Sequence, residues 1–171
     1  MLNIYKYSEI FPSLFEKEKK KIKSILGDVC LIEHIGSTAI EGVDGKGIID
    51  ILLIFENQND IESTVKSLQK NGYFLAVDSV KLNGRTFMSS SGIKESDFGD
   101  IHLHLAIENS DEYLNTILFR DYLRNHPKER QEYIDLKYKL FKEVAGNRPK
   151  YTESKNDFIR KIIASAKKDL L

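Results

Sequence analysis

The segment HIGSTAIEGVDGKGIIDILLIF, residues 34–55, joins a polar, glycine-rich loop to an apolar run that contains one acid, Asp50. The apolar run is short, rich in β-branched residues and preceded by glycines, which favours a strand buried on both faces. A carboxylate in such a strand costs several kcal/mol to bury in its ionised form unless a metal, a cation or hydrogen-bond donors face it. The fold must therefore supply a partner for Asp50.

A row of polar side chains is predicted on GDIHLHLAI, residues 99–107, where polar and apolar residues alternate. On a strand, Asp100, His102 and His104 lie on one face, while the apolar residues between them lie on the other. We expect Asp50 and this row to form one polar cluster in an otherwise apolar sheet. The alternative is a hydrogen-bonded structural pair, which is the commoner role of two histidines on a half-buried strand.

The loop before Asp50 has the residue types of a phosphate-binding loop. Gly36 allows the backbone to approach a ligand closely, Ser37 and Thr38 offer hydroxyl and N–H groups, and Lys46 adds a positive charge. The competing interpretation is a structural turn that Ser37 and Thr38 cap.

The remaining pattern predicts one α+β domain with a mixed sheet, and we place its sheet-bearing core at about 1–110 and a helical part at about 111–171. The first helix is expected over 8–26, with Ile10, Leu14, Ile22, Ile25 and Leu26 toward the core and Gly27 at its end. Further strands are predicted at 29–35, 48–55, 73–80 and 85–90, and further helices at 59–72, 111–127, 128–146 and 152–171.

Composition narrows the class of protein. A chain of 171 residues with 41% hydrophobic content and zero formal charge suits one globular domain. No apolar run is long enough to span a bilayer, and no signal peptide is evident, so a cytoplasmic protein without a membrane partner is expected. The single cysteine, Cys30, excludes an intramolecular disulfide and is predicted to be a buried thiol.

The charge is unevenly distributed along the chain. Residues 120–171 carry 14 basic and 8 acidic side chains, whereas residues 1–119 carry 12 basic and 18 acidic ones. A basic C-terminal third suits an anionic partner, such as a nucleotide or another small molecule that contains phosphate, although a solvated helix surface is the simpler explanation. The acidic remainder argues against nucleic acid as a partner.

The order Gly36-Ser37, twelve residues, then Asp50 resembles the signature of the nucleotidyltransferase superfamily that includes DNA polymerase β. More narrowly, HIGSTAIEGVDGKGIIDI, HLHL, FRDYLRNHP, EYIDLK and YTESKNDFI, in this order, resemble the GrpB family of bacterial proteins within that superfamily. The resemblance implies a nucleotidyltransferase-like mixed sheet with flanking helices, and a nucleotide or coenzyme-A-like ligand. It also implies a divalent metal as cofactor, with Mg²⁺ favoured over Mn²⁺ or Zn²⁺.

Carried over residue by residue, the resemblance assigns triphosphate binding to Gly36 and Ser37. It makes Asp50 the first of two metal-binding acids. Leu52 stands where the second acid is expected, and it cannot bind a metal. Three functions stay open: nucleotidyl transfer, a degenerate module that binds a nucleotide without turnover, and a metal-dependent phosphohydrolase. The candidate catalytic residues are Asp50, His102 and His104, with Asp50 and His104 as the candidate metal ligands.

Several cationic residues are candidate phosphate contacts. Arg85 and Arg120 each offer a bidentate fork, and Arg85 has a salt bridge as its structural alternative. On the predicted helices, Tyr133 with Lys137 and Tyr151 with Lys155 are spaced i, i+4, so each pair presents a ring and a cation, or else simply packs at the surface. The resemblance favours Arg120, Tyr151 and Lys155 among these.

Overall fold

The computed structural model describes residues 3–76, 86–91, 98–144 and 147–170. Their strands are β1 (Leu31–Ile35), β2 (Ile49–Phe55), β3 (Phe74–Leu75), β4 (Thr86–Ser89) and β5 (Ile101–Ile107). Their helices are α1 (Ile10–Leu26), α2 (Gln58–Lys70), α3 (Asp111–Asn125), α4 (Pro127–Glu143), α5 (Arg148–Glu153) and α6 (Asn156–Lys168), with a short 3₁₀ turn, η1 (Ser37–Ala39).

The strands form one mixed sheet in the order β1-β2-β5-β4-β3. β2 and β5 are parallel neighbours, and the other pairs are antiparallel. The predicted α+β class with a mixed sheet is therefore confirmed. β2 lies inside the sheet and all its residues except Asp50 are buried, as expected of a strand covered on both faces.

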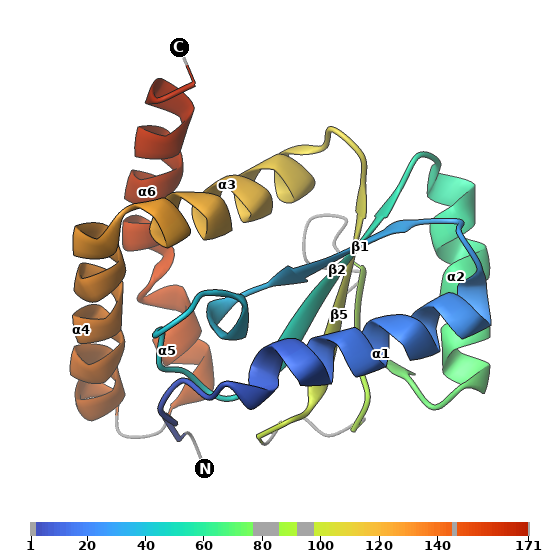
Figure 1. Ribbon diagram of the computed structural model, residues 1–171, viewed down its shortest axis with the longest axis horizontal. Helices are drawn as coiled ribbons and strands as arrows, with labels where there is room; N and C mark the ends of the chain where they lie inside the picture. Colours follow the sequence, from blue (N-terminus) through green and yellow to red (C-terminus); the bar gives the residue numbers. More distant parts are fainter. Residues whose placement is uncertain (1–2, 77–85, 92–97, 145–146, 171) are drawn as a thin grey trace.

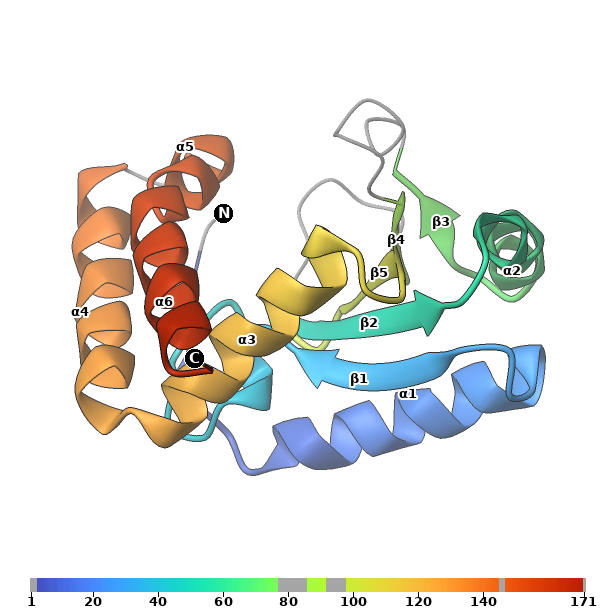
Figure 2. The same cartoon turned by 90° about the horizontal axis from the view of Figure 1, so that it is seen from above.

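The two faces of the sheet are covered differently (Figures 1 and 2). Helices α1 and α2 pack on the face that carries Ile49, Ile51 and Leu53, and this layer forms the largest apolar core. On the opposite face, which we call the site face, Leu52 and Ile54 pack with residues of α3. Asp50 lies on the site face beyond this apolar cluster.

Helices α4, α5 and α6 gather at the end of the sheet where β1 finishes and β2 begins (Figure 2). Loop 36–48 connects these two strands at the same end and meets the helices there. Its apolar residues Ile40 and Val43 are buried in a cluster with Leu123, Tyr133 and Ile162. The loop is thus packed against the helical part, which brings α4–α6 toward Asp50.

The first helix is placed slightly differently from its prediction. α1 begins at Ile10, whose side chain is 48% exposed, and buries Phe11, Phe15 and Ile22. The expected core position of Ile10 is therefore wrong, because the buried face is set by the two phenylalanines one turn apart. The helix ends at Gly27, which has a positive φ of 70°, as the pattern predicts.

The C-terminal segment contains two helices where the pattern predicts one over 152–171. α5 begins at the Asn147 cap, whose side-chain oxygen accepts a hydrogen bond from the Lys150 amide, and Pro149 lies in its first turn. α6 follows after Ser154.

The thiol of Cys30, which the sequence predicts to be buried, is half-buried in the structure. Burial raises the pKa of this thiol to about 11, against a small opposing effect of Lys23.

Residues 77–80 of the strand predicted at 73–80, and Arg85, lie outside the described residues. In the described ranges, no helix combines the length and the apolar character that crossing a bilayer requires.

Candidate functional site

The histidines of β5 face Asp50. The parallel register of β2 and β5 places Asp50 beside His102 and Leu52 beside His104. The Nε2 atom of His104 lies 3.1 Å from Asp50 Oδ1, and the Nδ1 atom of His102 lies 3.6 Å from the same oxygen. The polar cluster predicted from the alternation of the two strands therefore forms.

The carboxylate of Asp50 is held in its ionised form. Burial by itself raises the pKa of Asp50, but the hydrogen bonds and positive charge of His102 and His104 outweigh this effect. The pKa of Asp50 consequently lies far below its usual range. The site face thus presents a fixed negative charge at this point.

His102 lies between two carboxylates. Its Nε2 atom is 3.6 Å from Oδ2 of Asp100. Asp100 is fixed in turn by the hydroxyl groups of Ser90 and Ser91, which donate hydrogen bonds of 2.5 Å and 2.9 Å to its carboxylate. Asp100, predicted to share the face of His102 and His104, therefore supports His102 from the side opposite Asp50.

Gly36 contacts Asp50 directly. The backbone at Gly36 has a φ of 71°, and a Cβ atom built on it would lie 2.5 Å from Asp50 Oδ2. A side chain at residue 36 would therefore collide with the carboxylate. The glycine that the sequence suggests for close approach to a ligand is required here for close approach to Asp50.

Thr38 serves the structure of the loop. Its hydroxyl donates a 3.0 Å hydrogen bond to the carbonyl of Ile48 and lies 3.0 Å from Nε2 of His34. The His34 ring is on the α1 face of the sheet, where it stacks on Phe15 with ring centroids 4.6 Å apart. Thr38 is only 1% exposed, so the predicted ligand contact of its hydroxyl is replaced by an internal role.

Ser37 and Lys137 meet beside the loop. A Cβ atom built on Gly45 would lie 2.3 Å from Ser37 Oγ and 3.1 Å from Lys137 Nζ, so both polar atoms lie around one point. The Ser37 side chain is half-buried and makes no hydrogen bond with another described residue. The Lys137 amine donates a hydrogen bond to the carbonyl oxygen of Asp44 and lies 4.9 Å from the centre of the Tyr133 ring.

Asp44 connects loop 36–48 to the N-terminal segment and to helix α4. Its carboxylate accepts hydrogen bonds from the Lys6 amine (2.9 Å), the Tyr7 amide (2.9 Å) and the Tyr138 hydroxyl (2.7 Å). Burial would raise the pKa of Asp44, but these donors lower it below its ordinary value. The carboxylate of Asp44 is thus ionised and paired, and its carbonyl oxygen accepts the hydrogen bond from Lys137.

Three lysines interact electrostatically with one another and with Asp50. The pKa of Lys137 is lowered to about 7, chiefly by burial and also by Lys155 and Lys46, against the opposing charges of Asp44 and Asp50. Burial likewise lowers the pKa of Lys155 to about 8, with Lys46 lowering it and Asp50 raising it. Lys46 and Lys155 thus oppose the protonation of Lys137, and Lys46 opposes that of Lys155, while Asp50 favours both.

Tyr151 lies beneath Lys155. The Lys155 amine is 4.5 Å from the centre of the Tyr151 ring. Only 1% of Tyr151 is exposed, so its ring is not available for stacking on a base. Its hydroxyl is buried and has no hydrogen-bond partner among the described residues. A buried hydroxyl of this kind is expected to find a partner in a bound ligand or an ordered water.

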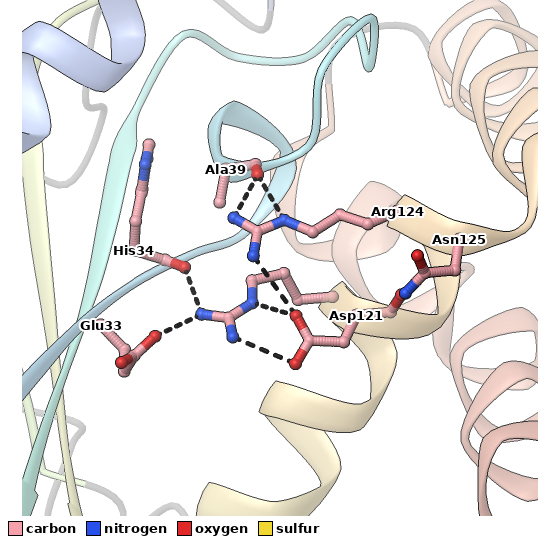
Figure 3. Close-up of polar contacts among 7 residues, drawn as sticks. Glu33, His34, Ala39, Asp121, Arg124 and Asn125 are labelled. Atoms are coloured by element: carbon pink, nitrogen blue, oxygen red, sulfur yellow. Dashed lines mark hydrogen bonds and ion pairs between the residues drawn. The ribbon is translucent and has the colours of Figure 1, made fainter.

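Arg120 is occupied by hydrogen bonds within the protein, and its partners Glu33, His34 and Asp121 are labelled in Figure 3. Its guanidinium donates hydrogen bonds to Glu33 (2.7 Å), the carbonyl of His34 (2.9 Å) and both carboxylate oxygens of Asp121. Arg124 binds the carbonyl oxygen of Ala39 in the same region. The predicted role of Arg120 as a phosphate contact is thus not supported, because its donors clamp α3 to β1.

Leu52 is fully buried at the place of the second acid. Its register neighbours are Glu33 on β1 and His104 on β5, and Glu33 is tied to Arg120. In the part of the chain that the structure describes, no group of three or more His, Cys, Asp or Glu side chains is arranged to hold a metal ion. The pair of divalent ions that the resemblance implies does not fit this donor set, while a single ion at Asp50 and His104 stays a prediction.

The comparisons with known proteins agree with this architecture. The family model "GrpB protein" matches residues 1–165. The chain belongs to the GrpB family. A UPF0157 protein of Halalkalibacterium halodurans is 31% identical over 96% of this chain and 82% of its own length. The glutamate-rich protein GrpB of Alkalihalophilus pseudofirmus is 32% identical over 92% of this chain and 91% of its own length.

Solved structures extend the comparison to the fold. The crystal structure of GrpB from Enterococcus faecalis superposes with a TM-score of 0.84 at 30% identity, covering 98% of this chain and 99% of that one. A structure of the Cid1 poly(U) polymerase bound to MgATP gives a TM-score of 0.53 at 12% identity, over 84% of this chain and 46% of that one. The chain therefore has a nucleotidyltransferase-like fold, as the resemblance carried by Gly36-Ser37 and Asp50 implies.

The structure adds Lys137 to the residues that the resemblance favours. The signal was present as a repeated Tyr-x-x-x-Lys pattern, in YIDLK at 133–137 and YTESK at 151–155. In both copies the lysine amine lies over the tyrosine ring. Phe87 of β4 is a second addition, because its ring contacts both His102 and His104 edge-on.

Proposed function

We propose that this GrpB protein binds a phosphate-bearing small molecule, a nucleotide or a coenzyme-A-like ligand, at the junction between loop 36–48 and helices α4–α6. The observation that carries the proposal is the Lys137 amine, which is buried next to Gly45, where the Ser37 hydroxyl also lies. Lys155 lies over the buried Tyr151 ring, whose hydroxyl has no partner among the described residues. The diphosphate ester of a nucleoside is the chemistry that these two ligand types share.

The energetics of the lysines support an anionic ligand. Lys137 is 3% exposed, and the cations near it oppose its protonation. Burying mutually repelling ammonium groups lowers the free energy of unfolding, so such a group is typical of a functional site. A bound phosphate would remove the repulsion and provide acceptors for the remaining N–H groups.

Calorimetry with Mg²⁺ present tests the binding proposal. ATP, UTP and coenzyme A are titrated into the wild type, Lys155→Met and a matched control, Lys150→Met, whose lysine lies exposed on α5. At least one ligand is expected to bind the wild type and the control alike, and Lys155→Met is expected to bind it about tenfold more weakly. Equal affinity for all three proteins would contradict the assignment of the site.

Nucleotidyl transfer is the second candidate function. It is favoured by the fold and by the place of Asp50 after the Gly36-Ser37 loop. Asp50 and His104 would hold a divalent ion, which when bound would polarise a phosphoryl oxygen. His102, between Asp50 and Asp100, is placed to orient Asp50 or to hold a proton.

A turnover assay separates the remaining alternatives. Release of pyrophosphate from a nucleoside triphosphate, abolished in Asp50→Asn, would support transfer. Binding without any release would support the degenerate module that Leu52 suggests. Release of inorganic phosphate that is lost in His104→Ala would identify a phosphohydrolase instead.

A further inference from the structure

Segment 3–7, which precedes α1, pairs with loop 36–48 through its backbone. The Tyr5 amide donates a 2.7 Å hydrogen bond to the Gly45 carbonyl, and the Gly45 amide donates one of 3.0 Å to the Tyr5 carbonyl. The Tyr5 ring packs edge-on against Phe98, with ring centroids 5.1 Å apart. Phe98 in turn fills the space in which a Cβ atom on Gly47 would lie. The segment is thus held against the part of the loop that contains the two glycines.

Asp44 joins this segment to the buried amine of Lys137. Its carboxylate oxygen Oδ1 accepts a hydrogen bond from the Tyr7 amide, while Oδ2 accepts hydrogen bonds from the Lys6 amine and the Tyr138 hydroxyl. The carbonyl oxygen of the same residue accepts the hydrogen bond of the Lys137 amine. A carboxylate with three donors is a strong anchor, because hydrogen bonds to an ionised group are stronger than neutral ones. The position of the Asp44 carbonyl is therefore set by groups outside the loop.

The Lys137 amine depends on this carbonyl for its position. A lysine side chain has a flexible four-carbon stem, so the partner of its amine decides where the amine lies. Among the described residues, the Asp44 carbonyl is the hydrogen-bond acceptor of this amine, and the centre of the Tyr133 ring lies 4.9 Å away. The next residue, Gly45, leaves free the space beside which the amine and the Ser37 hydroxyl lie. A shift of residues 44–45 would consequently displace the amine relative to Ser37.

We propose that segment 3–7 is a positioning element of the phosphate-binding site, acting on Lys137 through Asp44. The inference rests on the proposed function and adds to the site a part of the chain outside the loop and the C-terminal helices. Because a coupling free energy acts equally in both directions, docking of the segment should strengthen ligand binding, and a bound ligand should stabilise the docked segment. Lys6 and Tyr138 are positioning residues, since they act on Lys137 through Asp44.

Calorimetry with inorganic tripolyphosphate as the probe tests the first direction. The double variant Lys6→Met/Tyr138→Phe removes the two described donors of Asp44 Oδ2. It is expected to bind the probe about fivefold more weakly than the wild type. The matched control makes the same two changes elsewhere, Lys23→Met/Tyr122→Phe, at an exposed lysine of α1 and a tyrosine of α3. The control is expected to bind within about twofold of the wild type.

Hydrogen exchange followed by NMR tests the reverse direction in the wild type. The amides of Tyr5, Tyr7 and Gly45 donate hydrogen bonds that dock the segment, so saturating tripolyphosphate is expected to slow their exchange several-fold. The Tyr73 amide, which donates to the Leu68 carbonyl at the end of α2, is the control and should exchange at an unchanged rate. A segment that only supported the fold would not respond to the ligand in this way.

Three outcomes separate the inference from the proposed function. Binding of tripolyphosphate with unchanged exchange at Tyr5, Tyr7 and Gly45 would overturn the inference and leave the proposed function intact. Equal affinity of the two double variants would overturn it in the same way. Failure of the wild type to bind would refute the proposed function, and the inference with it. If Lys6→Met/Tyr138→Phe does not fold by circular dichroism, the exchange rates of the wild type still decide.

Discussion

The carboxylate of Asp50 fills the space in which a side chain on Gly36 would lie, since a Cβ atom there would be 2.5 Å from Oδ2. The phosphate-loop glycine and the strand acid are therefore one packed unit. His104 holds the other oxygen of the same carboxylate at 3.1 Å. Loop, acid and histidine are consequently coupled, and a change in one is expected to displace the others.

Gly36→Ala should destabilise the protein more than an alanine at another positive-φ glycine. Both the left-handed backbone and the collision with Asp50 oppose it, so we expect the free energy of unfolding to fall by about 3 kcal/mol. Gly42→Ala is the control: its φ is 78° but nothing lies within 4 Å of its built Cβ, so about 1 kcal/mol is expected. Urea unfolding measures both, and equal losses would argue against the contact between residues 36 and 50.

Lowering the pH should reduce the free energy of unfolding, because His34 becomes protonated. Burial, with smaller opposing and reinforcing effects of Asp50, Arg124 and Arg120, lowers the pKa of His34 from 6.5 to about 4. A depressed pKa means that the unfolded chain binds the proton first, so the contribution is complete above pH 6.5 and is lost as the pH falls toward 4. The free energy of unfolding should fall by about 3 kcal/mol over this range from this residue.

The matched variant for this titration is His34→Gln, which has no group that titrates there. The wild type should lose more stability than the variant between pH 6.5 and 4 in urea titrations at fixed ionic strength. Parallel curves would show that His34 is not buried as described.

Arg120→Met should destabilise the protein by about 3 kcal/mol, because Glu33, Asp121 and the carbonyl of His34 lose a shared donor. Arg120→Lys should restore little, since an ammonium cannot reproduce the planar fork. Arg160→Ala, at an exposed i, i+3 pair with Asp157, is expected to cost under about 0.5 kcal/mol. A folded Arg120→Met that binds phosphate much more weakly than the wild type would instead restore Arg120 as a ligand contact.

Binding of tripolyphosphate should be accompanied by proton uptake at pH 8. Lys137 and Lys155, with pKa values lowered to about 7 and about 8, are partly neutral there, and an anion favours their charged forms. Their neighbours Asp44 and Asp50, whose pKa values lie below the ordinary range, keep their negative charges at this pH. Affinity should therefore fall as the pH rises through 7 to 9, and calorimetry in buffers of different ionisation enthalpy measures the protons.

The lysine contribution is isolated by comparing the wild type with Lys155→Met, since the ligand's own titration is common to both. The variant is expected to take up about half a proton less at pH 8. An identical uptake in the two proteins would contradict the position of Lys155 at the phosphates.

Much of the fold was predictable because its signals are local. The alternation of polar and apolar residues places Asp50, His102 and His104 on one face of their strands, and the register of β2 and β5 brings those faces together. Glycine and proline positions predict most element ends, such as Gly27 and Pro127. The exceptions, Ile10 and the divided C-terminal helix, depend on which of several apolar residues reaches the core.

The roles of the cations were less predictable, because a side chain's partner lies far away in the sequence. Arg120 and Lys137 look alike as basic residues on amphipathic helices, but only the structure shows Arg120 paired with Glu33 and Lys137 hydrogen-bonded to the carbonyl of Asp44. Thr38 likewise resembles a ligand-binding hydroxyl until Ile48 and His34 are seen to surround it.

By itself the sequence determined the strands, the loop before Asp50, the polar row that faces it and the family. Those features follow from the two-residue period of a strand and from the spacing of a short motif, which need no knowledge of the distant chain. Tertiary structure alone decided which basic residues lie beside the loop, because α4–α6 reach loop 36–48 through the burial of Ile40 and Val43 and the contacts of Asp44. That docking is a property of non-local packing, and it makes Lys137 a candidate ligand residue and Arg120 a structural one.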